Sequence, residues 1–197
     1  MLDSASSHPR GSEDQILNRV EDDKRVSSPD VRTISERLDI VLAGENASVE
    51  IVGLVICKNT DEKSIEANIV HAAPGTKSKV IVKSVLKDRS TFAFRVNVRV
   101  EKGAKGADAY LRSDALLFDG AKMGDDTPAL EILEPDVKAG HAATIGKVDE
   151  NMLFYLMSRG LTRVAAERLL IQGFVNPVLD KIKSASLNPK SEALNSK

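Results

Sequence analysis

The period of the hydrophobic pattern changes once along this chain, within residues 136–160, and this change constrains the fold more than any other feature. Before it, apolar side chains recur at every second position, which is typical of half-buried β-strands. After it, Asp149 stands at an N-cap position before a dense apolar run that Gly160 ends, which predicts a capped helix. The chain is therefore expected to be mainly β, with a small helical region after the strands.

The alternation is clearest in residues 91–100, where apolar side chains face one way and polar side chains face the other. This pattern predicts a strand with one buried face. Runs of similar character lie at residues 49–57, 65–71, 80–86, 109–117 and 129–133. Short strands with frequent turns are compatible with a sandwich, a barrel or a β-solenoid, and periodicity alone does not separate these folds.

Local signals complete the expected order of elements. Residues 123–128 are expected to form a loop and residues 139–146 a glycine-bounded turn. A second helix is expected to open with Thr162 as its N-cap, and Pro177 is expected to kink or restart it. The expected divisions are a flexible tail at 1–30 with a short helix near 15–20, a β domain at 31–146, a helical domain at 147–183 and a polar tail at 184–197.

Composition argues against several classes of partner. The net charge of -1 and the sequence pI of 6.3 give no electrostatic attraction for nucleic acid or an anionic membrane. Aromatic residues make up only 4% of the chain, so a stacking platform for single-stranded nucleic acid is not expected. No apolar run approaches the ~20 residues that span a bilayer. Cys57 is the one cysteine, which excludes an internal disulfide framework and favours a reducing, cytoplasmic setting.

No catalytic constellation is expected from this sequence. Its three histidines lie on separate expected elements, so neither a Ser-His-Asp nor a Cys-His arrangement is indicated. The segment GAKG at 103–106 is too short for a phosphate-binding P-loop. Cys57 is expected to be a buried small hydrophobe, and His71, which precedes a Pro-Gly turn, is expected to bond to the backbone there. Glu131 and Asp136 are expected to face solvent.

Eight short segments, in order along the chain, resemble the SufB/SufD family of iron–sulfur cluster assembly proteins, and its SufD branch more than its SufB branch. They are HAAPGT (71–76), LKDRS (86–90), RVEKGA (99–104), ADAY (107–110), LEI (130–132), DVKAGHAATIG (136–146), LFYLMSRG (153–160) and AERLL (166–170). Each is weak alone, but their order across the change of period is specific. The resemblance implies a right-handed parallel β-helix followed by a small C-terminal α-helical domain.

The resemblance also implies partners and a site. In this family SufB and SufD pair through their β-helices, and a histidine at their interface helps to hold the nascent cluster. The motif match places His141 at that position, and neutral imidazole is a competent iron ligand. The alternative is that His141 satisfies backbone groups at a tight junction. No stably bound cofactor is expected, only a transient iron–sulfur cluster shared with a SufB-like subunit or a second copy of the chain.

The helical domain of the family holds SufC, an ABC-type ATPase that hydrolyses ATP during assembly. The resemblance implies that the helix after Asp149 serves partly as local core and partly as a docking surface for such an ATPase. The residues expected to contact the ATPase are Phe154, Tyr155, Met157, Arg159 and Leu161.

The chain departs from the family pattern in two ways. It is shorter than usual members, so the β-helix is expected to be short of turns and open at one end, to be covered by a partner unless the gene is truncated. Ser113 stands where SufB-type scaffolds supply a cysteine, so sulfur acceptance by this chain is not expected. A pseudo-scaffold that docks the ATPase without supporting clusters is one alternative. A β-helix carbohydrate-active enzyme is another, with Arg95, Arg99 and Asp108 on polar faces but few aromatics.

Overall fold

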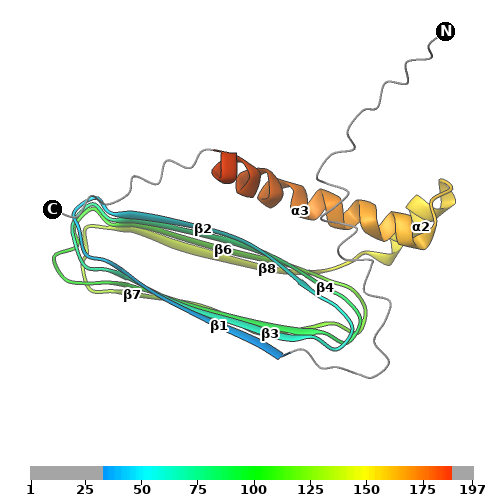
Figure 1. The fold of residues 1–197 in the computed structure, drawn as a ribbon, viewed down its shortest axis with the longest axis horizontal. Helices are drawn as coiled ribbons and strands as arrows, with labels where there is room; N and C mark the ends of the chain where they lie inside the picture. Colours follow the sequence, from blue (N-terminus) through cyan, green and yellow to red (C-terminus); the bar gives the residue numbers. More distant parts are fainter. Residues whose placement is uncertain (1–32, 188–197) are drawn as a thin grey trace, which may run out of the picture. The chain divides into compact units, whose positions relative to one another are not determined.

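Eight parallel strands wind into a flattened solenoid in the computed structural model, which describes residues 33–187 (Figure 1). Successive strands alternate between two sheets, one in the order β1-β3-β5-β7 and the other in the order β2-β4-β6-β8. The strands are β1 Thr33–Leu42, β2 Ser48–Cys57, β3 Glu62–His71, β4 Lys77–Leu86, β5 Thr91–Val100, β6 Asp108–Leu117, β7 Lys122–Ile132 and β8 Lys138–Lys147. The predicted β-helix architecture, mainly β with a helical region after it, is confirmed.

Equivalent residues of successive turns stack in register, so each forms a column through a sheet. Ile40 pairs with Ile69, which pairs with Val98, and Val98 pairs with Leu130. Side chains of paired residues in a parallel sheet point the same way, so the apolar residues of a column share one interior. The columns conserve side-chain character but not residue identity, which is why no exact repeat is visible in the sequence.

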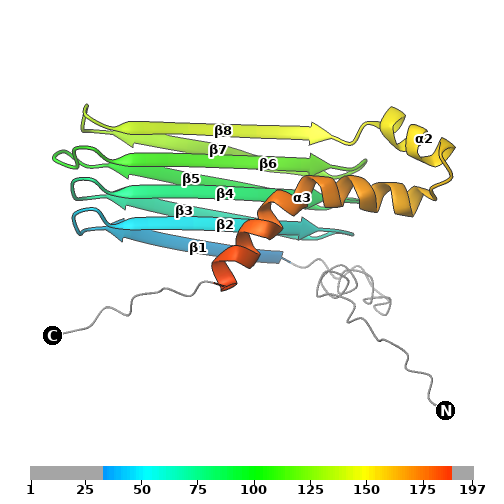
Figure 2. The same cartoon turned by 90° about the horizontal axis from the view of Figure 1, so that it is seen from above.

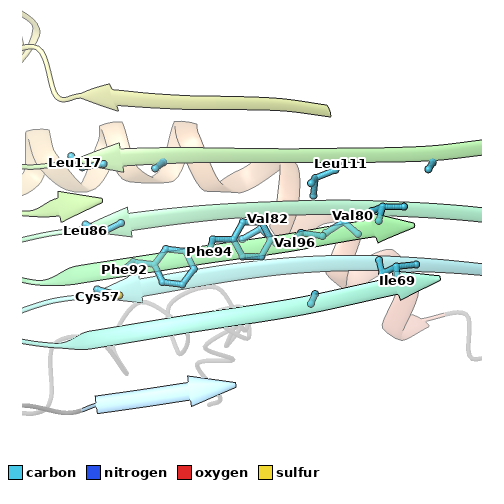
Figure 3. Close-up of a cluster of buried hydrophobic side chains, with 14 of the residues drawn as sticks. Cys57, Ile69, Val80, Val82, Leu86, Phe92, Phe94, Val96, Leu111 and Leu117 are labelled. Carbon is cyan, nitrogen blue, oxygen red and sulfur yellow. The ribbon is translucent and has the colours of Figure 1, made fainter. Parts of the chain in front are cut away.

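The core fills the space between the two sheets (Figure 3). Strand β5 contributes the predicted alternation, and its inward residues Phe92, Phe94, Val96, Val98 and Val100 are all buried. The rings of Phe92 and Phe94 stack with their centroids 6.2 Å apart. Cys57 is wholly buried in the same core, so its predicted role as a small hydrophobe is confirmed.

The turns between sheets also stack. Asp88 adopts a left-handed backbone conformation with φ of 60°, and its carboxylate accepts a 2.8 Å hydrogen bond from the backbone nitrogen of Asn59 in the turn before it. Gly120 occupies the next turn with φ of 88°, where a Cβ would come within 2.5 Å of the Asp88 carbonyl oxygen. Only glycine fits this approach without strain.

Two helices follow the last strand. Helix α2, Glu150–Ser158, begins at Asp149, whose side chain accepts a 2.8 Å hydrogen bond from the backbone nitrogen of Asn151, as the N-cap prediction requires. Helix α3, Arg163–Leu187, is preceded by Thr162, whose hydroxyl accepts from the Ala165 nitrogen at 3.2 Å. Figure 2 shows α3 running obliquely over the outer face of the even-numbered sheet.

The position of α3 is fixed by an apolar cluster outside the solenoid core. Val175 from α3 packs with Val85 and with Phe118, which follows β6. Pro177 was expected to kink or restart this helix, and it does not restart it, because α3 continues as one helix through this residue to Leu187. Val175 and Val178 are both buried on either side of Pro177, and this packing offsets the backbone hydrogen bond that proline cannot donate.

Two further expectations about local structure are wrong. Residues 123–128 form part of β7 and not a loop, with a register shift opposite Phe92 and Phe94. Residues 139–146 form most of β8 and not a turn, because β6 offers a complete parallel partner for them. Helix α3 also runs past the expected limit at residue 183. The expected tail at 1–30, its short helix near 15–20 and residues 188–197 lie outside the described residues.

Candidate functional site

Both sheets end on the same turn of the solenoid, with β7 as the last strand of one and β8 as the last strand of the other. In Figure 2, β7 and β8 lie at one end of the stacked turns, so interior columns end there. Ile132 stacks on the buried Val100 but is 45% exposed, and Ile145 stacks on the buried Ala115 but is 53% exposed. Within the described residues, this open end, made of β7 and β8, carries exposed apolar side chains beside a strand edge that has no further neighbour.

His141 lies on β8 at this open end. It pairs with Leu111, which is buried in the core, so His141 extends an interior column and is itself exposed. Among residues 33–187, no group of three or more histidine, cysteine or acidic side chains is placed to hold a metal ion. His141 can therefore offer one ligand from this surface but not a complete metal site within the described part of the chain.

A second polar group lies just inside the same end. Asp126 pairs with Phe94, and its Oδ2 accepts a 3.3 Å hydrogen bond from Ser113 Oγ. Burial raises the pKa of Asp126, Asp125 raises it further, and the Ser113 hydrogen bond lowers it. The other carboxylate oxygen, Oδ1, is buried without a hydrogen-bond partner among the described residues. Sequence reasoning missed Asp126, because the register shift that turns it inward falls where a loop was expected.

The chain's cysteine is remote from this end in the sheet order. Cys57 lies on β2, and β4 and β6 stand between it and β8. Burial raises the pKa of its thiol to about 11, so the thiol is protonated at neutral pH and unsuited to nucleophilic attack. Ser113, where a SufB-type cysteine was expected, is an interior residue of β6 and 2% exposed.

His71 is a structural residue. Its ring is wholly buried at the end of β3, with Nδ1 2.9 Å from Thr76 Oγ1 and Nε2 2.8 Å from Ser78 Oγ. The two ring nitrogens thus meet side-chain hydroxyls, and a backbone hydrogen bond at Thr76 accompanies them, as expected for a turn histidine. Burial lowers the pKa of His71, which favours the neutral ring.

Helix α2 presents most of its apolar side chains to solvent. Phe154 is 73% exposed, Tyr155 52% and Met157 40%, while Leu153 is buried. Arg159 is exposed, and its guanidinium lies 5.3 Å from the centroid of the Tyr155 ring. Four of the five predicted contact residues are therefore exposed on or just after one helix.

The fifth predicted contact residue, Leu161, is half-buried between the helices. On helix α3, Val164 is 66% exposed and Leu169 is 49% exposed. Neither residue was among the predicted contact residues. We call the exposed side chains of Phe154, Tyr155, Met157, Val164 and Leu169 the helical apolar surface.

The arginines of β5 are held by neighbouring carboxylates. Arg95 Nε lies 2.7 Å from Asp125 Oδ2, and Arg99 bonds to both Glu101 and Glu131 at 2.8 and 3.2 Å. These pairs run along the solvent face of the odd-numbered sheet, and Glu131 is exposed as expected.

The described residues include no helix long and apolar enough to cross a bilayer.

Stacked parallel turns, an open final turn and a helical apolar surface define a β-solenoid protein whose candidate sites are surfaces for other chains. Residues 26–174 match the family model described as "SUF system FeS cluster assembly, SufBD core domain". The chain belongs to this SufB/SufD family, as its sequence motifs suggested.

Curated relatives carry the same assignment. The chain is 38% identical over 141 residues to an iron–sulfur cluster assembly SufBD family protein of Mycobacterium tuberculosis. The aligned region covers 72% of this chain and 17% of that protein. It is 35% identical over 150 residues to the iron–sulfur cluster assembly protein SufD of Bacillus subtilis, covering 76% and 34%. Against SufB of the same organism the values are 31% over 137 residues, covering 70% and 30%. The chain thus spans about a third or less of these relatives' length.

Proposed function

We propose that this chain is a non-catalytic scaffold subunit of a SUF-type iron–sulfur cluster assembly complex. In this proposal α2 and α3 dock an ABC-type ATPase of the SufC kind, and the open end of the solenoid pairs with a SufB-like subunit or a second copy. We propose that this assembly takes place in the cytoplasm, in keeping with the single cysteine of the chain. The observation that carries the proposal is the exposure of Phe154, Tyr155 and Met157 on one helix.

The exposed apolar side chains of α2 support the docking role. Water-exposed apolar area of this kind is unfavourable in an isolated chain, and contiguous patches mark interaction surfaces. Tyrosine and arginine are enriched among residues that dominate binding energy, and Tyr155 and Arg159 lie side by side here. The buried Leu153 keeps the helix attached while its other side remains available.

The edge position of β8 supports the pairing role. Within residues 33–187 this ten-residue strand has one hydrogen-bonded neighbour, which leaves a row of backbone donors and acceptors for another chain. Ile132 and Ile145 would then be covered by the same partner. In that arrangement His141 lies at the interface and supplies one iron ligand, while the partner supplies the others.

A second candidate, the pseudo-scaffold that docks the ATPase without supporting clusters, is favoured by one specific observation. Cys57 is buried with a raised pKa, which disfavours its reaction with sulfur, and the family resemblance places Ser113 in the segment where SufB-type chains supply a cysteine. Both candidate functions include docking of the ATPase, and they differ in whether the chain supports cluster assembly. A carbohydrate-active enzyme is less well supported, because Arg95 and Arg99 are engaged by carboxylates on a face without aromatic platforms.

The experiment that tests the proposal is anaerobic affinity purification from the native cell, followed by mass spectrometry and assays for iron and sulfide. An ABC-type ATPase together with acid-labile sulfide supports the cluster scaffold. The ATPase without iron or sulfide supports the pseudo-scaffold. Bound polysaccharide and no ATPase would overturn both.

A further inference from the structure

A chain of ion pairs joins α2 to the solenoid by way of α3. Lys87 Nζ, in the turn after β4, lies 2.8 Å from Glu167 Oε2 on α3. The second carboxylate oxygen, Glu167 Oε1, accepts a 3.1 Å hydrogen bond from Arg163 Nε. Arg163 then donates from Nη1 and Nη2 to both oxygens of Glu150, in the first turn of α2, at 3.2 and 2.9 Å. Three elements are thus connected without a break.

This ion-pair chain acts where the packing of α2 is thin. Leu153 is the buried residue of α2, and the other residues of that helix are half-buried or exposed. One buried side chain supplies a pivot but does not fix the rotation of a short helix about it. A two-pronged arginine–carboxylate contact has a defined planar geometry. The Arg163–Glu150 pair therefore supplies the second point of contact that sets the orientation of α2.

Glu167 is the central member of the chain. Its side chain is 16% exposed, against 50% for Arg163 and 55% for Glu150. Exposed ion pairs contribute little on their own, but shielded ones are screened less by water and salt. Because one oxygen of Glu167 serves Lys87 and the other serves Arg163, removal of this one charge weakens both links.

We propose that Glu167 is a positioning residue that holds α2 in a fixed orientation on the solenoid, so that the exposed side chains of α2 are presented to a partner in one geometry. That this partner is an ATPase rests on the proposed docking, whereas the fixed orientation of α2 concerns this chain alone. The ion-pair chain connects α2, α3 and the turn after β4 and so acts on the orientation of α2 directly.

The orientation of α2 can be measured as a distance distribution between two spin labels on the full chain. Labels are attached at Ser158→Cys, at the end of α2, and Asn97→Cys, on the outer face of β5, since both positions are exposed. Cys57 is buried and protonated, so it escapes labelling. We expect a narrow distribution in the parent and a broader one in Glu167→Gln. Arg163→Gln, at a half-exposed site that is safe for folding, should broaden it too.

Two controls distinguish a specific effect on the orientation of α2 from a general loss of stability. Asp180→Asn removes one negative charge from an exposed position of the same helix and should leave the distribution narrow. At about 1 M salt, where the Debye length is ~3 Å, the distribution of the parent should broaden towards that of Glu167→Gln. Unchanged widths in both Glu167→Gln and Arg163→Gln would overturn the inference.

The same variants are then titrated with the purified SufC-type ATPase of the same cell. Glu167→Gln should bind about fivefold more weakly than the parent, because the orientation of α2 must be fixed on binding. If the parent binds no ATPase while Glu167→Gln still broadens the distribution, the docking proposal fails and the positioning role stands. If the ATPase binds parent and variant equally and the widths are equal, the positioning role fails and docking stands.

Discussion

His141 stacks directly on Leu111 in the register of β8 on β6, and at this step the column passes from the buried core to the open end. Because Leu111 is buried and His141 is the next residue of the column, the imidazole lies at the boundary between the interior and the surface proposed to bind a partner. The same register leaves His141 outside the packing that stabilises the fold. Its chemistry and the stability of the chain should therefore be separable.

We predict that His141→Ala leaves the free energy of unfolding within about 0.5 kcal/mol of the parent, because an exposed side chain is lost. On the proposed ligand role of His141, iron–sulfur cluster yield in the reconstituted anaerobic complex should fall clearly. Thr144→Ala, at an exposed position of the same strand, is the matched control and should keep the parental yield. Equal yields for His141→Ala and the parent would exclude a ligand role.

Cys57 should make stability fall at alkaline pH. Its folded thiol has a pKa raised by burial to about 11 from an ordinary value of 9.0, so the folded state keeps the proton more firmly than the unfolded state. Its contribution is therefore complete below pH 9.0 and is lost as the pH rises towards about 11. Urea unfolding across this range should show a downward slope that Cys57→Ala reduces. A slope of the same size in Cys57→Ala would contradict the assignment.

Asp126 should make the stability of the chain depend on pH in the acidic range. Because burial raises the pKa of Asp126, the folded state still binds a proton at pH values where the unfolded state has already released it. Its contribution is therefore greatest at low pH and is lost as the pH rises through the folded pKa. We predict that Asp126→Asn, which keeps the shape without the charge, raises stability at neutral pH. Asp125→Asn is the neighbouring control, and its pKa is lowered by Thr127 and Arg95, so its effect should have the opposite sign.

Packing between α3 and the even-numbered sheet should carry much of the attachment of the helical region. Val175→Ala removes a side chain that is 2% exposed and should cost about 2 kcal/mol in urea unfolding. Val164→Ala makes the identical change at a position that is 66% exposed on the same helix and should cost less than about 0.5 kcal/mol. Similar costs for the two variants would mean that α3 does not pack as described.

Much of this fold could be predicted from alternation and capping signals. The inward face of β5 and the N-cap at Asp149 follow from local chemistry alone. Strand β8 could not be predicted in this way, because its glycines and small residues resemble a turn until β6 supplies a hydrogen-bonding partner. The inward position of Asp126 depends on a register shift, which leaves no periodic trace in the sequence.

The candidate sites likewise include residues that could be predicted from local sequence and residues that could not. Residue type and helical position sufficed to single out Phe154 and Tyr155 on α2, both of which are exposed. The ion-pair chain through Glu167 could not be foreseen, because Lys87 and Glu167 are 80 residues apart in sequence and meet only when α3 folds back over β4. Long-range pairs of this kind are set by tertiary packing and not by local pattern.

The most direct test of the docking claim is a calorimetric titration of the full chain with the purified SufC-type ATPase. Phe154→Ala and Tyr155→Ala should each weaken binding about tenfold or more, because both remove exposed aromatic anchors. Val41→Ala, at a position on β1 that is 63% exposed, is the matched apolar control and should bind as the parent does. Unweakened binding by both α2 variants, or no binding by the parent, would contradict the claim that the helical apolar surface holds an ATPase.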